Sequence, residues 1–242
     1  MMPFKAMRLR AGVVGIDPYF ANVVSLVHYD GSSGQTGPFA DQIAARSPGW
    51  TQVAPNAILD TGVVKYGTAA VNTGTVGLYN PNHADWDFGS GDFTIEYWIY
   101  HTSLNGASGY TVHAYKGTNG GVGPWVVFNI SGAVYFRVSK DGSTNAVNFN
   151  GGSISLNTWN HIAMVRQTNT VYGYVNGVSV GSGTISGGGA LHVNTDPVYA
   201  GTYGASSNEA LAGRMDDWRV TKAARYPNGT TFTVPAAAFP NS

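Results

Sequence analysis

The sequence predicts an all-β fold in which two antiparallel sheets pack face to face. The clearest sign is the segment 88–100, FGSGDFTIEYWIY, where a glycine turn leads into residues that alternate between two faces. A period of two, rich in aromatic and β-branched residues, is typical of a strand with one face in a core. The segment 158–180 repeats this pattern around Asn176-Gly177, the strongest hairpin signal in the chain. With 33 glycines and 11% charged residues, the composition favours short strands and tight turns.

Composition also narrows the class of protein. The chain has 242 residues and is 43% hydrophobic, which is enough for one sizeable core. Its 13 basic and 13 acidic residues give no net charge, so neither nucleic-acid binding nor attachment to a membrane surface is expected. The absence of cysteine excludes disulfides and thiol chemistry. No apolar run is long enough for membrane insertion, and the run 11–16 is too short for a signal-peptide core, so we expect synthesis in a cytoplasm without a secretory signal.

The chain divides into one domain with two irregular ends. Residues 1–22 combine basic residues with a Gly-Val-Val-Gly hinge and are expected to form an N-terminal arm. Residues 23–226 form the sandwich, and 227–242, punctuated by prolines, form an irregular tail. Strands are expected at 23–29, 63–71 with a break at Gly67, 76–79, 93–100, 110–115, 125–130, 133–138, 159–166, 170–175, 178–185 and 212–220.

Three segments together resemble the concanavalin A-like, laminin-G-like jelly rolls. The segment 87–98, DFGSGDFTIEYW, looks like the opening core strand of that family. TWNHIAMVR at 158–166 and YGYVNGV at 172–178 resemble its central hairpin, and GRMDDWRV at 213–220 resembles its closing strand. The resemblance implies a two-sheet antiparallel jelly-roll sandwich over about residues 23 to 225.

The flanking segments resemble laminin-G-like proteins encoded by tailed bacteriophages. These segments are DPYFANVVSLVHYD at 17–30, and RVTKAARY at 219–226 followed by FTVP at 232–235. The resemblance implies a virion structural protein, either a head decoration or a tail component, on the virion surface. Its partners would then be capsid, tail or fibre proteins. Because exposed edge strands are expected to be covered by neighbouring copies, we also predict a homo-oligomer. The residues expected to anchor the domain to the particle are Lys5, Arg8, Arg10, Tyr19 and Phe20.

The alternative function is binding of a host-surface glycan by a receptor-recognition or adhesin module. Aromatic faces stack on sugar rings while polar groups bond the hydroxyls. The candidate glycan-binding residues are Trp98, Tyr100, Trp125, Tyr172 and Tyr174, with Tyr110 also available. The opposing interpretation is that a sandwich uses its aromatic residues to fill the core.

A third possibility is a glucanase-like glycosidase, which needs a pair of carboxylates across the scissile bond. The two glutamates, Glu96 and Glu209, are far apart and have no partner at alternating spacing, so no catalytic residue is assigned and no enzyme is expected.

Metal binding is equally weakly indicated. Aspartates gather at 85–92 and at Asp216-Asp217, but their spacing does not match a calcium loop, so no cofactor or metal is expected. We expect Asp216 or Asp217 to pair with Arg214 or Arg219, and His161 to be a packed, hydrogen-bonded histidine.

Overall fold

The computed structural model describes residues 16–54, 56–104, 106–118, 122–204 and 208–242. Lys5, Arg8 and Arg10, expected in the anchor, lie outside the described residues. The strands are β1 Val23–Val27, β2 Thr51–Gln52, β3 Ile58–Asp60, β4 Ala70–Asn72, β5 Leu78–Asn80, β6 Phe93–His101, β7 Tyr110–Lys116, β8 Trp125–Ile130, β9 Ala133–Val138, β10 Val147–Ser153, β11 Trp159–Gln167, β12 Thr170–Val175, β13 Val178–Thr184, β14 Val198–Ala200 and β15 Gly213–Thr221. Four single 3₁₀ turns accompany them: η1 Phe20–Asn22, η2 Ala44–Arg46, η3 Ala84–Trp86 and η4 Pro227–Gly229.

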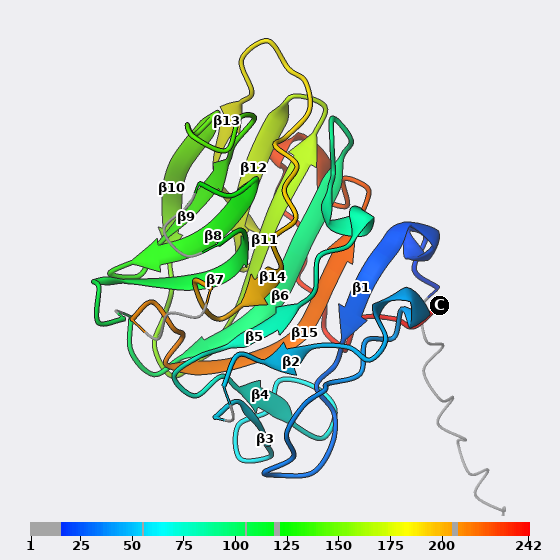
Figure 1. The fold of residues 1–242 in the computed structure, drawn as a ribbon, viewed down its shortest axis with the longest axis vertical. Helices are drawn as coiled ribbons and strands as arrows, with labels where there is room; N and C mark the ends of the chain where they lie inside the picture. Colours follow the sequence, from blue (N-terminus) through cyan, green and yellow to red (C-terminus); the bar gives the residue numbers. More distant parts are fainter. Residues whose placement is uncertain (1–15, 55, 105, 119–121, 205–207) are drawn as a thin grey trace, which may run out of the picture.

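The strands form two sheets, so the predicted sandwich is confirmed (Figure 1). The eight-stranded sheet runs β13-β12-β11-β6-β15-β4-β3, and β1 pairs with the C-terminal half of β15, residues 218–221. The seven-stranded sheet runs β10-β9-β8-β7-β14-β5-β2. Every named strand pair is antiparallel, and the described residues contain no α-helix and hence no helix able to cross a membrane.

The alternation predicted for 93–100 sets the position of β6 in the middle of the eight-stranded sheet. Phe93, Ile95, Tyr97 and Ile99 lie in the core between the sheets. β6 pairs with β11 on one side and β15 on the other, which are the three segments that carried the family resemblance. The hairpin at Asn176-Gly177 is also confirmed, because both residues have the positive φ of a type I′ turn.

Other strands differ from the prediction. The pair expected within 63–71 is replaced by β3 and β4, since Gly67 (φ +65°) lies in a turn that packs on Asp30. The short strands β2 and β14 and the glycine-containing β10 were not predicted. Two or three residues are too few to display a period, and glycine is depleted in strands.

The outer face of the eight-stranded sheet is covered by a third layer made from both ends of the described chain. Figure 1 shows the C-terminal end beside β1 and η1, where the backbone N–H of Asp17 donates to the carbonyl of Ser242 over 2.9 Å. Tyr226 and Phe232 stack with ring centroids 3.5 Å apart, and Phe232 lies 5.3 Å from Tyr174 of β12. The C-terminal segment forms no strand, and it packs against the domain.

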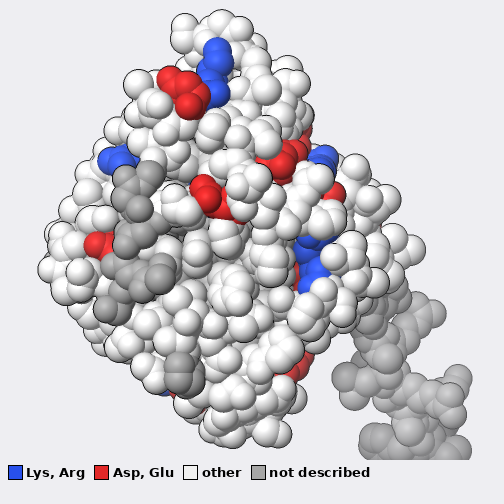
Figure 2. All heavy atoms as spheres, viewed as in Figure 1, with Lys and Arg blue, Asp and Glu red and all other residues white. Residues whose placement is uncertain are grey.

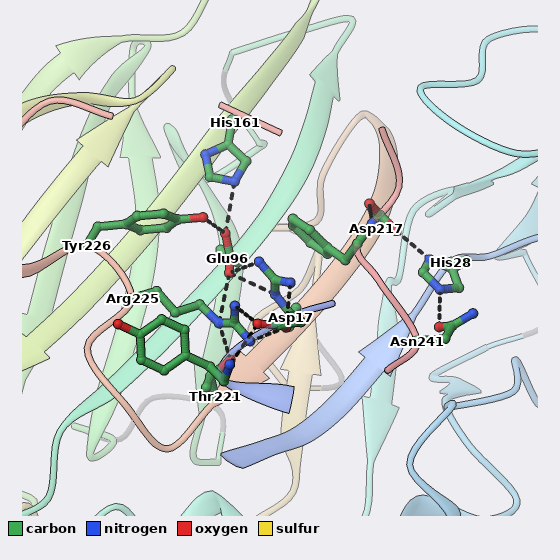
Figure 3. A network of polar contacts seen from close by, with 12 residues as sticks. Asp17, His28, Glu96, His161, Asp217, Thr221, Arg225, Tyr226 and Asn241 are labelled. Atoms are coloured by element: carbon green, nitrogen blue, oxygen red, sulfur yellow. Dashed lines mark hydrogen bonds and ion pairs between the residues drawn. The ribbon is translucent and has the colours of Figure 1, made fainter. Parts of the chain in front are cut away.

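Beneath this layer, the carboxylate of Glu96 on β6 is fully buried and has three kinds of partner (Figure 3). Arg219 on β15 donates from Nε over 2.9 Å, and the hydroxyl of Tyr226 donates over 2.7 Å. His161 on β11 places Nε2 3.2 Å from the same carboxylate, which agrees with the expectation of a hydrogen-bonded histidine. Burial alone would raise the pKa of Glu96, but the charge of Arg219 and the bond to His161 hold it well below its usual range.

Asp17 extends the same network toward the N-terminal side. Its carboxylate accepts from both terminal nitrogens of Arg225, over 2.9 and 2.7 Å, and from Arg219 over 3.2 Å. The ring of Phe239 lies 3.8 Å from the guanidinium of Arg219, which closes the network to solvent. The network therefore fastens both ends of the described chain to the sheet.

The pairing predicted for Asp216 and Asp217 with Arg214 or Arg219 is wrong. A bulge interrupts the register of β15 between residues 216 and 219, and Asp217 has a φ of +49°. Asp217 therefore turns toward His28, 2.5 Å away. Asp216 accepts three backbone N–H bonds instead of an arginine.

Two fully buried histidines, His101 on β6 and His113 on β7, predict an acid-sensitive core. Their Nε2 atoms are 3.1 Å apart, and His113 donates to Asn129 Oδ1 over 2.9 Å. His101 uses Nδ1 to donate to the carbonyl of Ser103, so its Nε2 accepts and both rings are neutral. Burial lowers the pKa of His101 from 6.5 to about 4 and also lowers that of His113.

At acidic pH, His101 and His113 therefore bind protons in the unfolded chain while they stay neutral in the folded chain. We expect the free energy of unfolding to be unaffected by His101 above pH 6.5 and to fall by about 3 kcal/mol as the pH drops toward 4. Urea unfolding at a series of pH values measures the slope of the free energy of unfolding against pH. His101→Gln should flatten it and His192→Gln, a half-exposed loop variant, should not. An unchanged slope in His101→Gln contradicts the assignment.

Candidate functional site

The five aromatic residues proposed for glycan binding do not form one surface. Trp98, Tyr100, Tyr172 and Tyr174 point to the outer face of the eight-stranded sheet. Trp125 instead points inward and is fully buried in the core between the sheets, where Phe88 lies 6.0 Å from it. Trp125 therefore has no face available for stacking on a sugar.

Two of the other four, Tyr174 and Trp98, are covered by the chain itself. Tyr174 is fully buried, and its hydroxyl donates to the carbonyl of Tyr226 over 2.7 Å. Trp98 is 3% exposed, with the ammonium of Lys65 3.8 Å from its ring centroid and the ring of Tyr66 5.9 Å away. Tyr100 and Tyr172 are half-buried.

The outer face of the seven-stranded sheet carries an aromatic belt that the sequence analysis did not identify. We define the belt by six residues on five neighbouring strands, β5, β14, β7, β8 and β9: Tyr79, Tyr199, Tyr110, Tyr115, Phe128 and Tyr135. Tyr199 is the direct cross-strand partner of both Tyr79 and Tyr115, and Phe128 is the partner of Tyr135. Cross-strand partners lie on the same face of a sheet, so the rings share this face. Between β7 and β8 the partners of Tyr115 and Phe128 are Val126 and Val112.

At the middle of this belt lies a hollow of about 340 Å³, which we call the aromatic hollow. Its lining consists of Tyr110, Val112, Tyr115, Val122, Gly123, Val126, Phe128, Ile130, Arg137, Asn145 and Tyr203. Tyr203 follows β14 and stacks on Tyr115, with ring centroids 4.5 Å apart. Tyr110 packs edge to face on Phe128 at 5.9 Å. The walls are therefore rings held by other rings, which is a largely preformed arrangement.

The polar groups of the hollow are few. The hydroxyl of Tyr115 donates to the carbonyl of Thr118 over 2.8 Å. Burial, and then the neighbouring Tyr203, raise the pKa of Tyr115 well above its usual range, so its hydroxyl stays neutral. Burial and Glu209 also raise the pKa of Tyr110. Arg137 is the single charged residue among those lining the aromatic hollow.

A second, polar hollow of about 140 Å³ adjoins the first and shares Tyr115, Val122 and Gly123 with it. Its other side is formed by His192, Asn194 and Asp196, all on the loop before β14. An apolar floor beside a polar one is the arrangement that a sugar chain needs, because its rings have apolar faces and its edges carry hydroxyls.

Lys116 lies next to the polar hollow. Its side chain is fully buried, and oxygen atoms surround its ammonium group. Its ammonium donates to Asn82 Oδ1 over 2.6 Å and to the carbonyls of Asn194 and Asp196 over 3.3 and 3.1 Å, with Asp87 Oδ1 at 3.5 Å. Carbonyl and carboxylate oxygens are also the ligands of Ca²⁺. Here they surround a side-chain cation.

The remaining aspartates of the 85–92 cluster are also engaged. Asp85 pairs with Arg46 and Lys222, and Asp92 accepts the backbone N–H of Thr168 over 2.6 Å. Within the described ranges, no three His, Cys, Asp or Glu side chains are arranged to hold a metal ion.

Two of the residues expected to anchor the domain to a particle, Tyr19 and Phe20, are described, and both contact the domain itself. Tyr19 lies 5.2 Å from the guanidinium of Arg225, and Phe20 packs against Val23, Leu26 and Phe239. The surface seen in Figure 2 carries scattered acidic and basic side chains without a patch of one sign.

The profile described as the concanavalin A-like lectin/glucanases superfamily matches residues 65–228. A search of curated protein sequences gave no significant match.

Several solved structures share the fold. The binding domain of Paraclostridial Mosquitocidal Protein 1 superposes with a TM-score of 0.64 at 16% identity, over 85% of this chain and 50% of that one. The binding domain of botulinum neurotoxin serotype G gives 0.57 at 14% identity, over 84% and 48%. The chain thus spans about half the length of these toxin domains. Domain 4 of AbnA, a GH43 extracellular arabinanase from Geobacillus stearothermophilus solved in complex with arabinotriose, gives 0.59 at 15% identity, over 84% and 93%.

Proposed function

Because the chain belongs to the concanavalin A-like lectin/glucanase superfamily, we propose that it is a non-catalytic carbohydrate-binding module. The observation that carries the proposal is the aromatic belt across the seven-stranded sheet, with the hollow at its centre. Sugar rings lie against Tyr110, Phe128 and Tyr203, and the adjoining polar hollow bonds the hydroxyls of the next sugar. The fold neighbours, which are mostly binding domains, support a binding role.

Hydrolysis is not part of the proposal. A glycosidase places two carboxyl groups about 5–9.5 Å apart across the scissile bond. Among the described residues lining the aromatic hollow there is no Asp or Glu. Glu96, the carboxylate singled out in the sequence, is fully buried on the outer face of the eight-stranded sheet and ion-paired with Arg219.

A role on a bacteriophage virion stays a prediction from sequence resemblance, together with homo-oligomer formation and virion partners. It is compatible with carbohydrate binding, since a module that contacts a host glycan can be carried on a particle. The binding site proposed here lies on the seven-stranded sheet, away from the layer in which Tyr19 and Phe20 pack.

Removing a wall of the hollow is expected to weaken binding. Tyr110→Ala and Tyr203→Ala should each weaken the tightest glycan found on an array by about tenfold or more, because each removes a stacking face. Isothermal titration with the full chain measures the affinity, and thermal melting checks the fold.

The matched control is Tyr172→Ala, which removes a half-buried tyrosine from the outer face of the other sheet. It should leave the affinity unchanged. Loss of binding in Tyr172→Ala alone would move the site to the eight-stranded sheet, and an array with no bound glycan would contradict the proposal altogether.

A further inference from the structure

Arg137 differs from every other arginine in the described part of the chain. The terminal nitrogens of the others are bonded within the protein: Arg46 to Asp85, Arg166 to two carbonyls, Arg214 to Asp60, Arg219 to Glu96 and Asp17, and Arg225 to Asp17. Arg137 uses only Nε, which donates to Asn148 Oδ1 over 3.0 Å. Across the described residues, neither of its two terminal nitrogens has a protein partner, and it forms no ion pair.

The guanidinium of Arg137 is nevertheless held in one place. It lies over the ring of Phe128 at 4.5 Å from the centroid and 6.0 Å from the centroid of Tyr135. Cation–π stacking fixes its plane, and the bond to Asn148 fixes its rotation in that plane. Its unused fork is therefore presented at the aromatic hollow in a set orientation.

A rigid guanidinium fork matches a carboxylate, with two parallel N–H···O bonds. We propose that the aromatic hollow takes a glycan that carries a carboxylate, such as a uronic or sialic acid, and that Arg137 binds this carboxylate through its two terminal nitrogens. This inference rests on the proposed function and adds its ligand class.

The charged side chains that line the two hollows, Arg137 and Asp196, give the bound sugar chain a direction. The aromatic hollow has no acidic lining residue, whereas the adjoining polar hollow includes Asp196. A carboxylate is attracted to Arg137 and repelled by Asp196. The acidic sugar therefore occupies the aromatic hollow, and a neutral sugar occupies the polar one.

The test compares each acid with its neutral methyl ester. The probes are oligogalacturonate, oligoguluronate and sialyllactose, each as the free acid and as the ester, alongside neutral oligosaccharides, titrated into the full chain. We expect at least one acid to bind about tenfold or more tightly than its ester, as expected for charge-assisted bonds. Arg137→Gln should remove this difference, and Arg137→Lys, which keeps the charge without the fork, should retain part of it.

Lys140→Gln is the matched control, because it removes one exposed positive charge just after β9, the strand that carries Arg137. It should bind like the wild type. Neutral glycans that bind while no acid exceeds its ester would overturn the inference and leave the proposed function standing. If no probe binds, acidic or neutral, the proposed function fails with it.

Discussion

Replacing Glu96 with glutamine is expected to lower the free energy of unfolding by about 3–5 kcal/mol, the usual result of removing one partner from a buried ion pair. The glutamine keeps the shape but leaves Arg219, only 4% exposed, without the carboxylate that its Nε and Nη2 contact. It also leaves Tyr226 and His161 facing an amide. Urea unfolding followed by tryptophan fluorescence measures the loss.

A double variant separates the charge imbalance from packing. Glu96→Met combined with Arg219→Met removes both charges, and replacing both partners of a buried pair by apolar residues is often neutral. The double variant should therefore be more stable than either single variant. A double variant as unstable as the sum of the singles would show that Glu96 and Arg219 are not coupled energetically, which would contradict the assignment of a buried ion pair.

The same carboxylate gives a second pH dependence, distinct from that of the histidine pair. Because the pKa of Glu96 in the folded state lies below its ordinary value of 4.5, its contribution to stability is fully present above that pH and is lost as the pH falls further. Glu96→Gln should lack this loss below pH 4.5. The slope between pH 6.5 and 4 that arises from His101 should persist in the variant.

Replacing Trp125 with alanine is expected to cost about 3–5 kcal/mol, as for other fully buried tryptophans. The side chain is completely enclosed between the sheets, next to Phe88 and the inner faces of both layers. Its removal leaves a cavity that the flanking strands of a sandwich cannot close. Thermal and urea unfolding measure the change.

The affinity of folded Trp125→Ala for its glycan should match the wild type, since the residue faces away from the aromatic hollow. Trp159→Ala, at the half-buried start of β11, is the comparison variant and should cost less. A selective loss of binding with unchanged stability in Trp125→Ala would contradict its assignment to the core.

The strand β8 shows why the sequence predicts the fold better than the site. Residues 125–130 alternate correctly, but both of their faces are apolar: one has Trp125 and Val127, the other Phe128 and Ile130. Periodicity assigns residues to opposite faces without saying which face is the core. Trp125 therefore lies in the core and cannot stack on a sugar, while the same alternation places Phe128 on the opposite face, in the hollow.

The contacts that define the site and the ion network are long-range. Arg219 lies 123 residues from Glu96, and Asp17 lies 208 residues from Arg225. The aromatic belt depends on β14, a three-residue strand that brings Tyr199 between β5 and β7. Such pairings follow from sheet order, which the pattern of a single strand does not encode.

The most direct test of the account is a crystal structure of the chain soaked with its tightest-binding oligosaccharide. The account predicts a sugar ring against Phe128 and Tyr203, with its carboxylate on the terminal nitrogens of Arg137. A sugar bound instead on the outer face of the eight-stranded sheet, beside Trp98 and Tyr172, would contradict it.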